Sequence, residues 1–159
     1  MATQWFQAVH AAKRFRLGTE KKDITGARFI YGKGVASNVL GAVVLFADNA
    51  YTPVLVTNAS LSGIIAISAS ANTSATNFSW YMVYGDTLNV PALKGLVGID
   101  TGSTDKASCS TSSGTSGRVV GGGVVATKTI VGMYAQGVSA SNLGDALLNY
   151  PMVAGGSLA

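Results

Sequence analysis

Charged residues are scarce in this chain of 159 residues, because Asp, Glu, Lys and Arg make up only 11% of it, against about 25% in ordinary soluble domains. A single cysteine, Cys109, excludes an internal disulfide. The single histidine, His10, has no acidic residue near it in the sequence, which argues against a catalytic triad built on histidine. The seven acidic residues show no paired or Asp-x-Asp spacing, so we expect neither a metal site nor a cofactor.

Long apolar runs are missing as well. The runs at residues 41–47 and 63–69 are too short, because about 18 consecutive apolar residues are needed to cross a bilayer. The first residues lack the pattern of a secretory signal, since polar side chains interrupt the apolar ones. We therefore expect no membrane partner. The length suits one domain with a core that needs no disulfide or metal.

The positive charge lies mostly at one end of the chain. Residues 1–33 hold seven basic and two acidic residues, whereas residues 34–159 hold four basic and five acidic ones. We interpret residues 1–26 as a basic N-terminal arm, with one short helix within residues 5–17, and residues 27–159 as a β-rich domain. Such an arm predicts contact with an acidic partner or with nucleic acid, and the alternative is a solvated terminus. The arm lacks a long basic helix, zinc ligands and a stacking platform, which argues against nucleic acid.

Short strands separated by turn residues are predicted along the rest of the chain. The predicted strands are residues 27–31, 42–47, 53–57, 63–68, 77–84, 88–90, 95–99, 118–125, 129–136 and 146–152. This spacing favours an antiparallel or mixed sandwich or barrel over parallel βαβ units. Residues 101–117 are rich in Ser, Thr and Gly, and we expect them to form a long surface hairpin or a mobile loop.

The strand at residues 77–84 is apolar on both faces. Its alternation puts Phe78, Trp80 and Tyr84 on one face and Tyr81 on the other. One interpretation is a central strand of the core, and the other is a sheet that buries its second face against another subunit. A third is a carbohydrate that stacks on Trp80.

Residues 100–103 carry a possible catalytic motif. Their sequence, Asp-Thr-Gly-Ser, follows apolar residues and matches the local signature of aspartic peptidases, in which two carboxylates share a proton. The chain has one copy, so a homodimer acting through Asp100-Thr101-Gly102 would have to supply the second carboxylate. The apolar-apolar-Gly element at residues 130–132 follows too closely for the strands and flap of that fold. The alternative is that Asp100 starts a turn.

Two parts of the sequence, residues 63–85 and 144–151, resemble a known family. Residues 63–67 (GIIAI), the connector at 69–77 (ASANTSATN) and the strand at 78–85 (FSWYMVYG) resemble the small capsid decoration, or cement, proteins of tailed bacteriophages. In that group a Ser-Ala-Asn-Thr-like connector leads to a Trp-aromatic strand that ends in Tyr-Gly. Residues 144–151 (GDALLNYP) resemble the group's terminal strand, and the basic stretch before Gly26 lies outside the pattern.

This resemblance implies an all-β fold, a compact antiparallel or mixed β-barrel or β-tulip-like sandwich, here with an N-terminal arm. It implies a structural virion protein on the capsid surface that binds the major capsid protein, often as a homotrimer, and catalyses no reaction. Binding only the mature lattice stabilises that lattice by mass action. The expected capsid contacts are Lys13, Arg14, Arg16, Lys21, Lys22 and Arg28. The expected subunit-contact or core residues are Phe78, Trp80, Tyr81 and Tyr84.

Two other classes of structural protein fit the same composition. A head fibre, or another receptor- or glycan-binding module, would also be β-rich and non-enzymatic, and would bind sugar through Trp80 or residues 101–117. A minor capsid or head-tail joining protein differs chiefly in its copy number on the particle.

Overall fold

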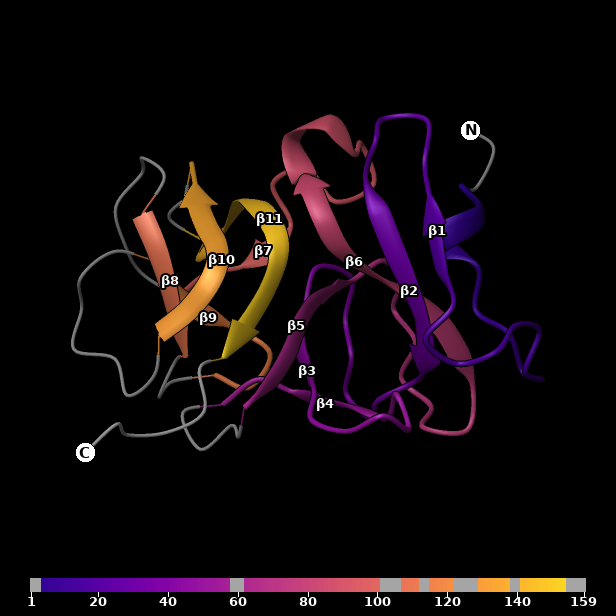
Figure 1. Cartoon of the computed structure of the whole chain (residues 1–159). Helices are drawn as coiled ribbons and strands as arrows, with labels where there is room; N and C mark the ends of the chain where they lie inside the picture. Colours follow the sequence, from indigo (N-terminus) through magenta and orange to yellow (C-terminus); the bar gives the residue numbers. More distant parts are fainter. Residues whose placement is uncertain are drawn as a thin grey trace.

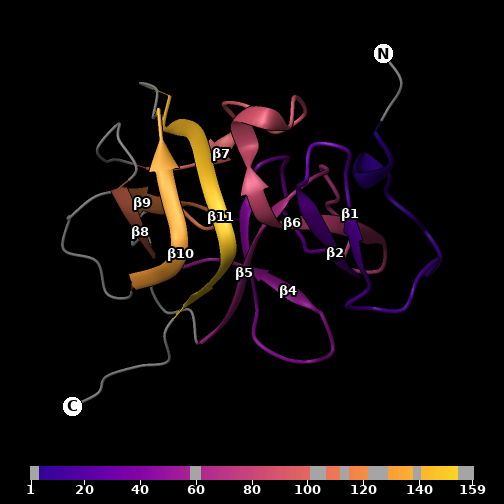
Figure 2. The same cartoon turned by 45° about the horizontal axis from the view of Figure 1, so that its top comes forward.

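One curled, antiparallel sheet forms most of this protein (Figure 1). The computed structural model describes residues 4–57, 62–100, 107–111, 115–121, 129–137 and 141–153. The main strand order is β1-β2-β6-β5-β11-β10-β8-β9, with β3 beside β5, β4 beside β3, and β7 beside β11. Figure 2 shows β10, β11 and β6 neighbouring one another along this sheet. The predicted all-β class is confirmed.

The strands and two short 3₁₀ helices of the described residues follow one another along the chain. They are η1 (Trp5–Gln7), β1 (Glu20–Lys22), β2 (Arg28–Lys33), β3 (Val43–Phe46), β4 (Pro53–Leu55), β5 (Gly63–Ser68), β6 (Phe78–Asp86), η2 (Thr87–Asn89), β7 (Val97–Gly98), β8 (Ala107–Thr111), β9 (Val119–Gly121), β10 (Thr129–Gln136) and β11 (Leu143–Val153).

Most of the predicted strands are present, and the differences have local causes. The strand predicted at residues 88–90 is wrong, because the Asp86 carboxylate accepts a hydrogen bond from the backbone N–H of Leu88 (2.9 Å) and so caps η2. Part of the stretch predicted as a surface hairpin or loop, residues 107–111, is β8, which pairs with both β9 and β10. Residues 101–106 and 112–114 of that stretch lie outside the described residues.

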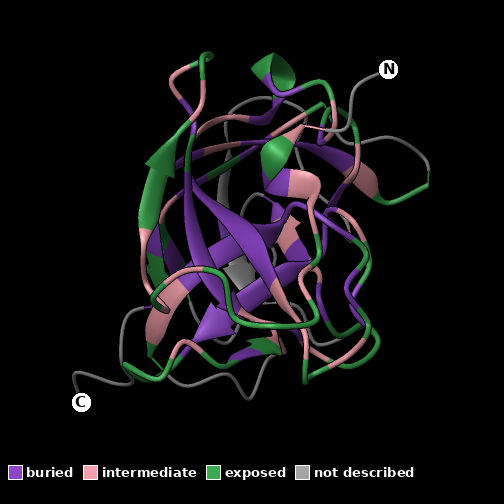
Figure 3. Cartoon of the chain, turned by 90° about the vertical axis from the view of Figure 1, so that its right-hand side faces the viewer, coloured by how far each residue is buried: buried purple, intermediate pink, exposed green. Residues whose placement is uncertain are grey.

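Strand β6 has both faces buried, as its sequence predicts. Trp80 and Met82 belong to the larger core, while Tyr81 and Val83 belong to a second cluster on the other side of the sheet. Partly buried residues of the same chain, including Tyr51, cover that second cluster. Buried strands therefore cross the middle of the molecule in Figure 3.

The basic N-terminal segment packs against this sheet. In place of the expected short helix, η1 is a single 3₁₀ turn, and its Phe6 is fully buried in the larger core. His10 forms a β-bridge with Phe78, and β1 pairs antiparallel with β2. The boundary predicted at residue 26 thus falls in the turn that joins two paired strands.

The pairing of β10 with β11 is interrupted where Gly132 lies against residues 149–151. The register shifts between Val131 and Met133, and both Gly132 (φ +84°) and Tyr150 (φ +44°) have left-handed backbone conformations. A Cβ atom at Gly132 would lie 2.6 Å from the carbonyl oxygen of Asn149. Only glycine fits there, and the irregularity turns the Tyr150 side chain to the surface.

We expect Gly132→Ala to lower the free energy of unfolding by about 2–3 kcal/mol, since it adds a backbone clash to an unfavourable φ. Gly137→Ala is the matched control, because Gly137 has a φ of +56° and no atom of the described residues lies within 4 Å of its added Cβ, so it carries only the φ cost of about 1 kcal/mol. Urea unfolding of both variants measures the difference. Equal losses would contradict a tight approach between β10 and β11.

Candidate functional site

The four aromatic residues predicted on β6 have different environments. Trp80 is only 1% exposed and Tyr81 is fully buried, while Phe78 is half-buried against the larger core. No sugar can therefore stack on Trp80. Tyr84 is 39% exposed, because the pairing of β2 with β6 shifts by one residue between Arg28 and Phe29 and takes Tyr84 off the face of Trp80.

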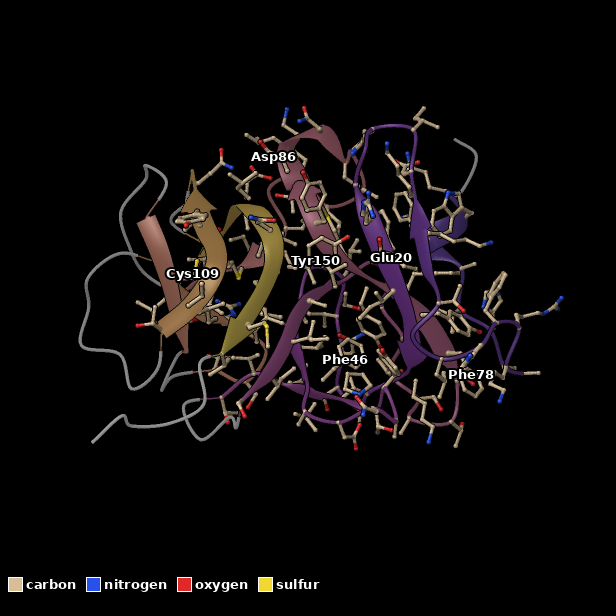
Figure 4. All side chains as sticks on the ribbon, in the orientation of Figure 1. Glu20, Phe46, Phe78, Asp86, Cys109 and Tyr150 are labelled. Atoms are coloured by element: carbon tan, nitrogen blue, oxygen red, sulfur yellow. The ribbon has the colours of Figure 1, made fainter. Side chains whose placement is uncertain are left out.

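Tyr84 lies in a group of four residues that come from four strands. Its ring centroid is 5.5 Å from that of Tyr150 on β11, and the Arg28 guanidinium lies 5.8 Å from the Tyr84 ring. The Glu20 carboxylate accepts hydrogen bonds from the Tyr150 hydroxyl (3.0 Å) and from Nη1 of Arg28 (2.8 Å). Figure 4 labels Tyr150 and Glu20, which approach each other on the outer side of the sheet. Loss of solvent, and then the bond to Glu20, raise the pKa of Tyr150.

An apolar hollow continues from Tyr150 along β10 and β11. Val131 and Met152 are paired across the two strands and are 62% and 50% exposed, and Tyr134 lines the same hollow of about 470 Å³. We name the surface formed by Tyr84, Val131, Tyr134, Tyr150 and Met152 the tyrosine face. Contiguous exposed apolar patches of this kind are typical of protein contact sites. Pro151 within a predicted strand is the sequence signal of an irregularity that could have found it.

The six basic residues predicted as capsid contacts fall into two groups. Lys13, Arg14, Arg16 and Lys22 are exposed, and so are Lys21 and Arg28. Lys21 and Arg28 differ from the other four in that their charged groups also contact side chains of the same chain. The Lys21 ammonium lies 4.1 Å from the ring centroid of Phe15, 5.5 Å from that of Trp80 and 5.7 Å from that of Trp5. It thus holds β1 to the aromatic cluster of the core, while Arg28 pairs with Glu20.

His10 contacts other residues of the fold through both its ring and its backbone. Its Nδ1 atom lies 3.0 Å from the hydroxyl oxygen of Tyr31, which also accepts a hydrogen bond from the backbone N–H of Arg14 (3.3 Å). Burial, and then the positive charge of Arg14, lower the pKa of His10 below its ordinary value. The ring is therefore neutral near neutral pH and helps to fix the N-terminal segment.

Three other titratable side chains, those of Asp100, Asp145 and Cys109, are bonded or buried within the fold. The Asp100 carboxylate pairs with Arg118 (3.4 Å) and accepts from the backbone N–H of Thr115, whereas a peptidase aspartate shares a proton with a second carboxylate. Thr101 and Gly102 of that motif lie outside the described residues. Asp145 accepts from the Thr87 hydroxyl (3.0 Å). Cys109 is fully buried, and burial raises the pKa of its thiol to about 12.

Among the described residues, no three His, Cys, Asp or Glu side chains gather as a metal site requires. No helix in the described ranges is long and apolar enough to cross a membrane. No protein-family model, curated protein or solved structure matches this chain.

We expect Lys21→Met, which keeps the apolar stem and removes the charge, to lower the free energy of unfolding by about 1 kcal/mol through loss of the cation–π contacts. Lys22→Met is the matched control, because the neighbouring Lys22 is exposed on the same strand and such surface changes shift stability by about 0.5 kcal/mol or less. Guanidinium unfolding followed by tryptophan fluorescence measures both. Equal effects would mean that the rings do not hold Lys21.

Proposed function

We propose that this chain is a structural virion protein that binds and stabilises the capsid of a tailed bacteriophage as a decoration, or cement, protein. The observation that carries the proposal is the tyrosine face, an exposed apolar surface with basic residues at its border. In this proposal the protein acts by adhesion at the virion surface, with the major capsid protein as its partner, and it is not an enzyme.

The two segments that resemble the decoration family support the proposal by their positions. Residues 63–68 and 78–86 form β5 and β6, and residues 144–151 lie in β11. Strand β11 pairs with β5 through Met152 and Val153, and with β6 through Leu147 to Asn149. Segments far apart in the sequence that carry one family pattern are therefore neighbours in one sheet, as a shared fold requires.

The surface chemistry also suits adhesion. Few charges need to lose water when this surface is covered, since charged residues are scarce in the whole chain. Burial of Val131, Met152 and the exposed tyrosines supplies the driving force. Many copies arranged by the symmetry of a shell add their weak contacts through avidity. The homotrimer that the resemblance implies remains part of the proposal.

Alternative functions make different demands on the same residues. A head fibre or glycan-binding module would have to bind sugar through residues 101–117 or through an exposed ring such as Trp5, Tyr84, Tyr134 or Tyr150, because Trp80 is buried, and binding on a glycan array would favour it. A minor capsid or head-tail joining protein would be present in far fewer copies per particle. A homodimeric aspartic peptidase would lose peptide hydrolysis on Asp100→Asn.

We expect the purified protein to saturate expanded capsids built from its own phage's major capsid protein and to raise their melting temperature. Val131→Glu places a charge on the tyrosine face and should weaken binding at least about tenfold. Val54→Glu is the matched control, since Val54 is 49% exposed on β4 and lies outside the tyrosine face. Co-sedimentation with capsids measures all three proteins.

The outcomes separate the two parts of this proposal. Failure of the wild-type protein to bind capsids would remove the decoration function. Full binding by Val131→Glu would keep that function and exclude the tyrosine face as its contact surface.

A further inference from the structure

The turn between β1 and β2 presents one apolar side chain to solvent. Ile24 is 99% exposed, and the turn stands at the top of the molecule in Figure 1. The backbone N–H of Asp23 donates to the carbonyl of Ala27 (2.8 Å), that of Gly26 donates to the carbonyl of Asp23 (3.0 Å), and the Thr25 hydroxyl donates to the Asp23 carboxylate (3.1 Å). The turn is therefore fixed in shape before any partner binds.

Two positive charges face each other at the base of this turn. Lys22 and Arg28 are directly opposed partners in the antiparallel pairing of β1 with β2, an arrangement that is unfavourable for like charges. Glu20 partly offsets this repulsion, because its carboxylate accepts a hydrogen bond from Nη1 of Arg28. The guanidinium has further N–H donors for another acceptor. Within the described part of the chain, Lys22 takes part in no ion pair. An anion placed between the two cations would remove the repulsion.

A shallow hollow of about 370 Å³ lies beside these two residues. Its lining residues are Lys22, Thr25, Gly26, Arg28, Tyr84 and Gly85. None of them is acidic, two carry a positive charge, and Tyr84 joins the hollow to the tyrosine face. The lysine ammonium and the arginine guanidinium are the donors that proteins use to bind carboxylates through charge-assisted hydrogen bonds.

We propose that this hollow binds the carboxylate of an Asp or Glu side chain on a partner protein, while Ile24 enters an apolar site next to that carboxylate. The exposed isoleucine favours a protein over a nucleic acid, because a phosphate backbone offers no apolar site for it. That the partner is a shell protein rests on the proposed function. The carboxylate chemistry rests on the hollow alone.

Titration of the full-length, ¹⁵N-labelled protein by NMR tests this inference. The probe is the peptide acetyl-Leu-Glu-Leu-amide, and acetyl-Leu-Gln-Leu-amide has the same shape without the charge. We expect saturable shifts at the backbone amides of Thr25, Gly26, Arg28 and Gly85 with the Glu peptide, and at least fivefold weaker binding of the Gln peptide. Lys22→Gln should weaken binding of the Glu peptide by the same factor. Lys13→Gln, which changes an exposed lysine outside the hollow, should leave that binding unchanged.

Equal binding of the two peptides, or shifts away from the hollow, would overturn the inference. Tighter binding of inorganic phosphate or of a short single-stranded oligonucleotide at the same amides would also overturn it, in favour of a phosphate site. If Lys22→Gln and Ile24→Ser both bind capsids like the wild type, the shell is not the partner of the hollow and the decoration function stands. If the Glu peptide binds but capsids do not, the hollow is supported and the decoration function fails.

Discussion

The packing of N-terminal aromatic residues around Trp80 is the interaction on which the outer surface of this protein depends. Trp5 meets Trp80 edge to face with ring centroids 5.0 Å apart, and Phe6 stacks on Phe29 at 4.3 Å. These contacts fix Trp5 and Phe6 against the sheet, and Trp5 and Trp80 are among the rings around the Lys21 ammonium. Strand β1 is thereby held in place, although all of its side chains are exposed.

The tyrosine face and the basic hollow follow from that anchoring. With β1 in place, Glu20 reaches both Arg28 and Tyr150 and so connects the first strand of the sheet to β11. The same strand brings Lys22 opposite Arg28. A sequence of low overall charge thus gathers part of its positive charge next to an apolar surface, which is the combination that contact with another protein uses.

Sequence patterns predicted the buried part of this fold better than its surface. Alternation identified the two covered faces of β6 because burial acts on every second residue. It could not identify β1, whose Glu-Lys-Lys sequence has no apolar residue and depends on contacts with distant rings. Tyr84 and Tyr150 reach the surface through irregular pairing, which local periodicity does not encode. The predicted basic contacts did not distinguish Lys21, whose ammonium contacts aromatic rings of the chain, from its neighbour Lys22, although both are exposed.

We propose, above all, that this protein works by adhesion of its outer sheet surface to a viral shell. A cryo-electron microscopy reconstruction of intact particles at side-chain resolution tests it most directly. The account predicts density for this chain on the outside of the capsid, repeated over the lattice, with Tyr84 and Tyr150 turned towards the major capsid protein. Absence of the chain from the particles, or a lattice-bound chain whose tyrosine face points to solvent, would contradict it.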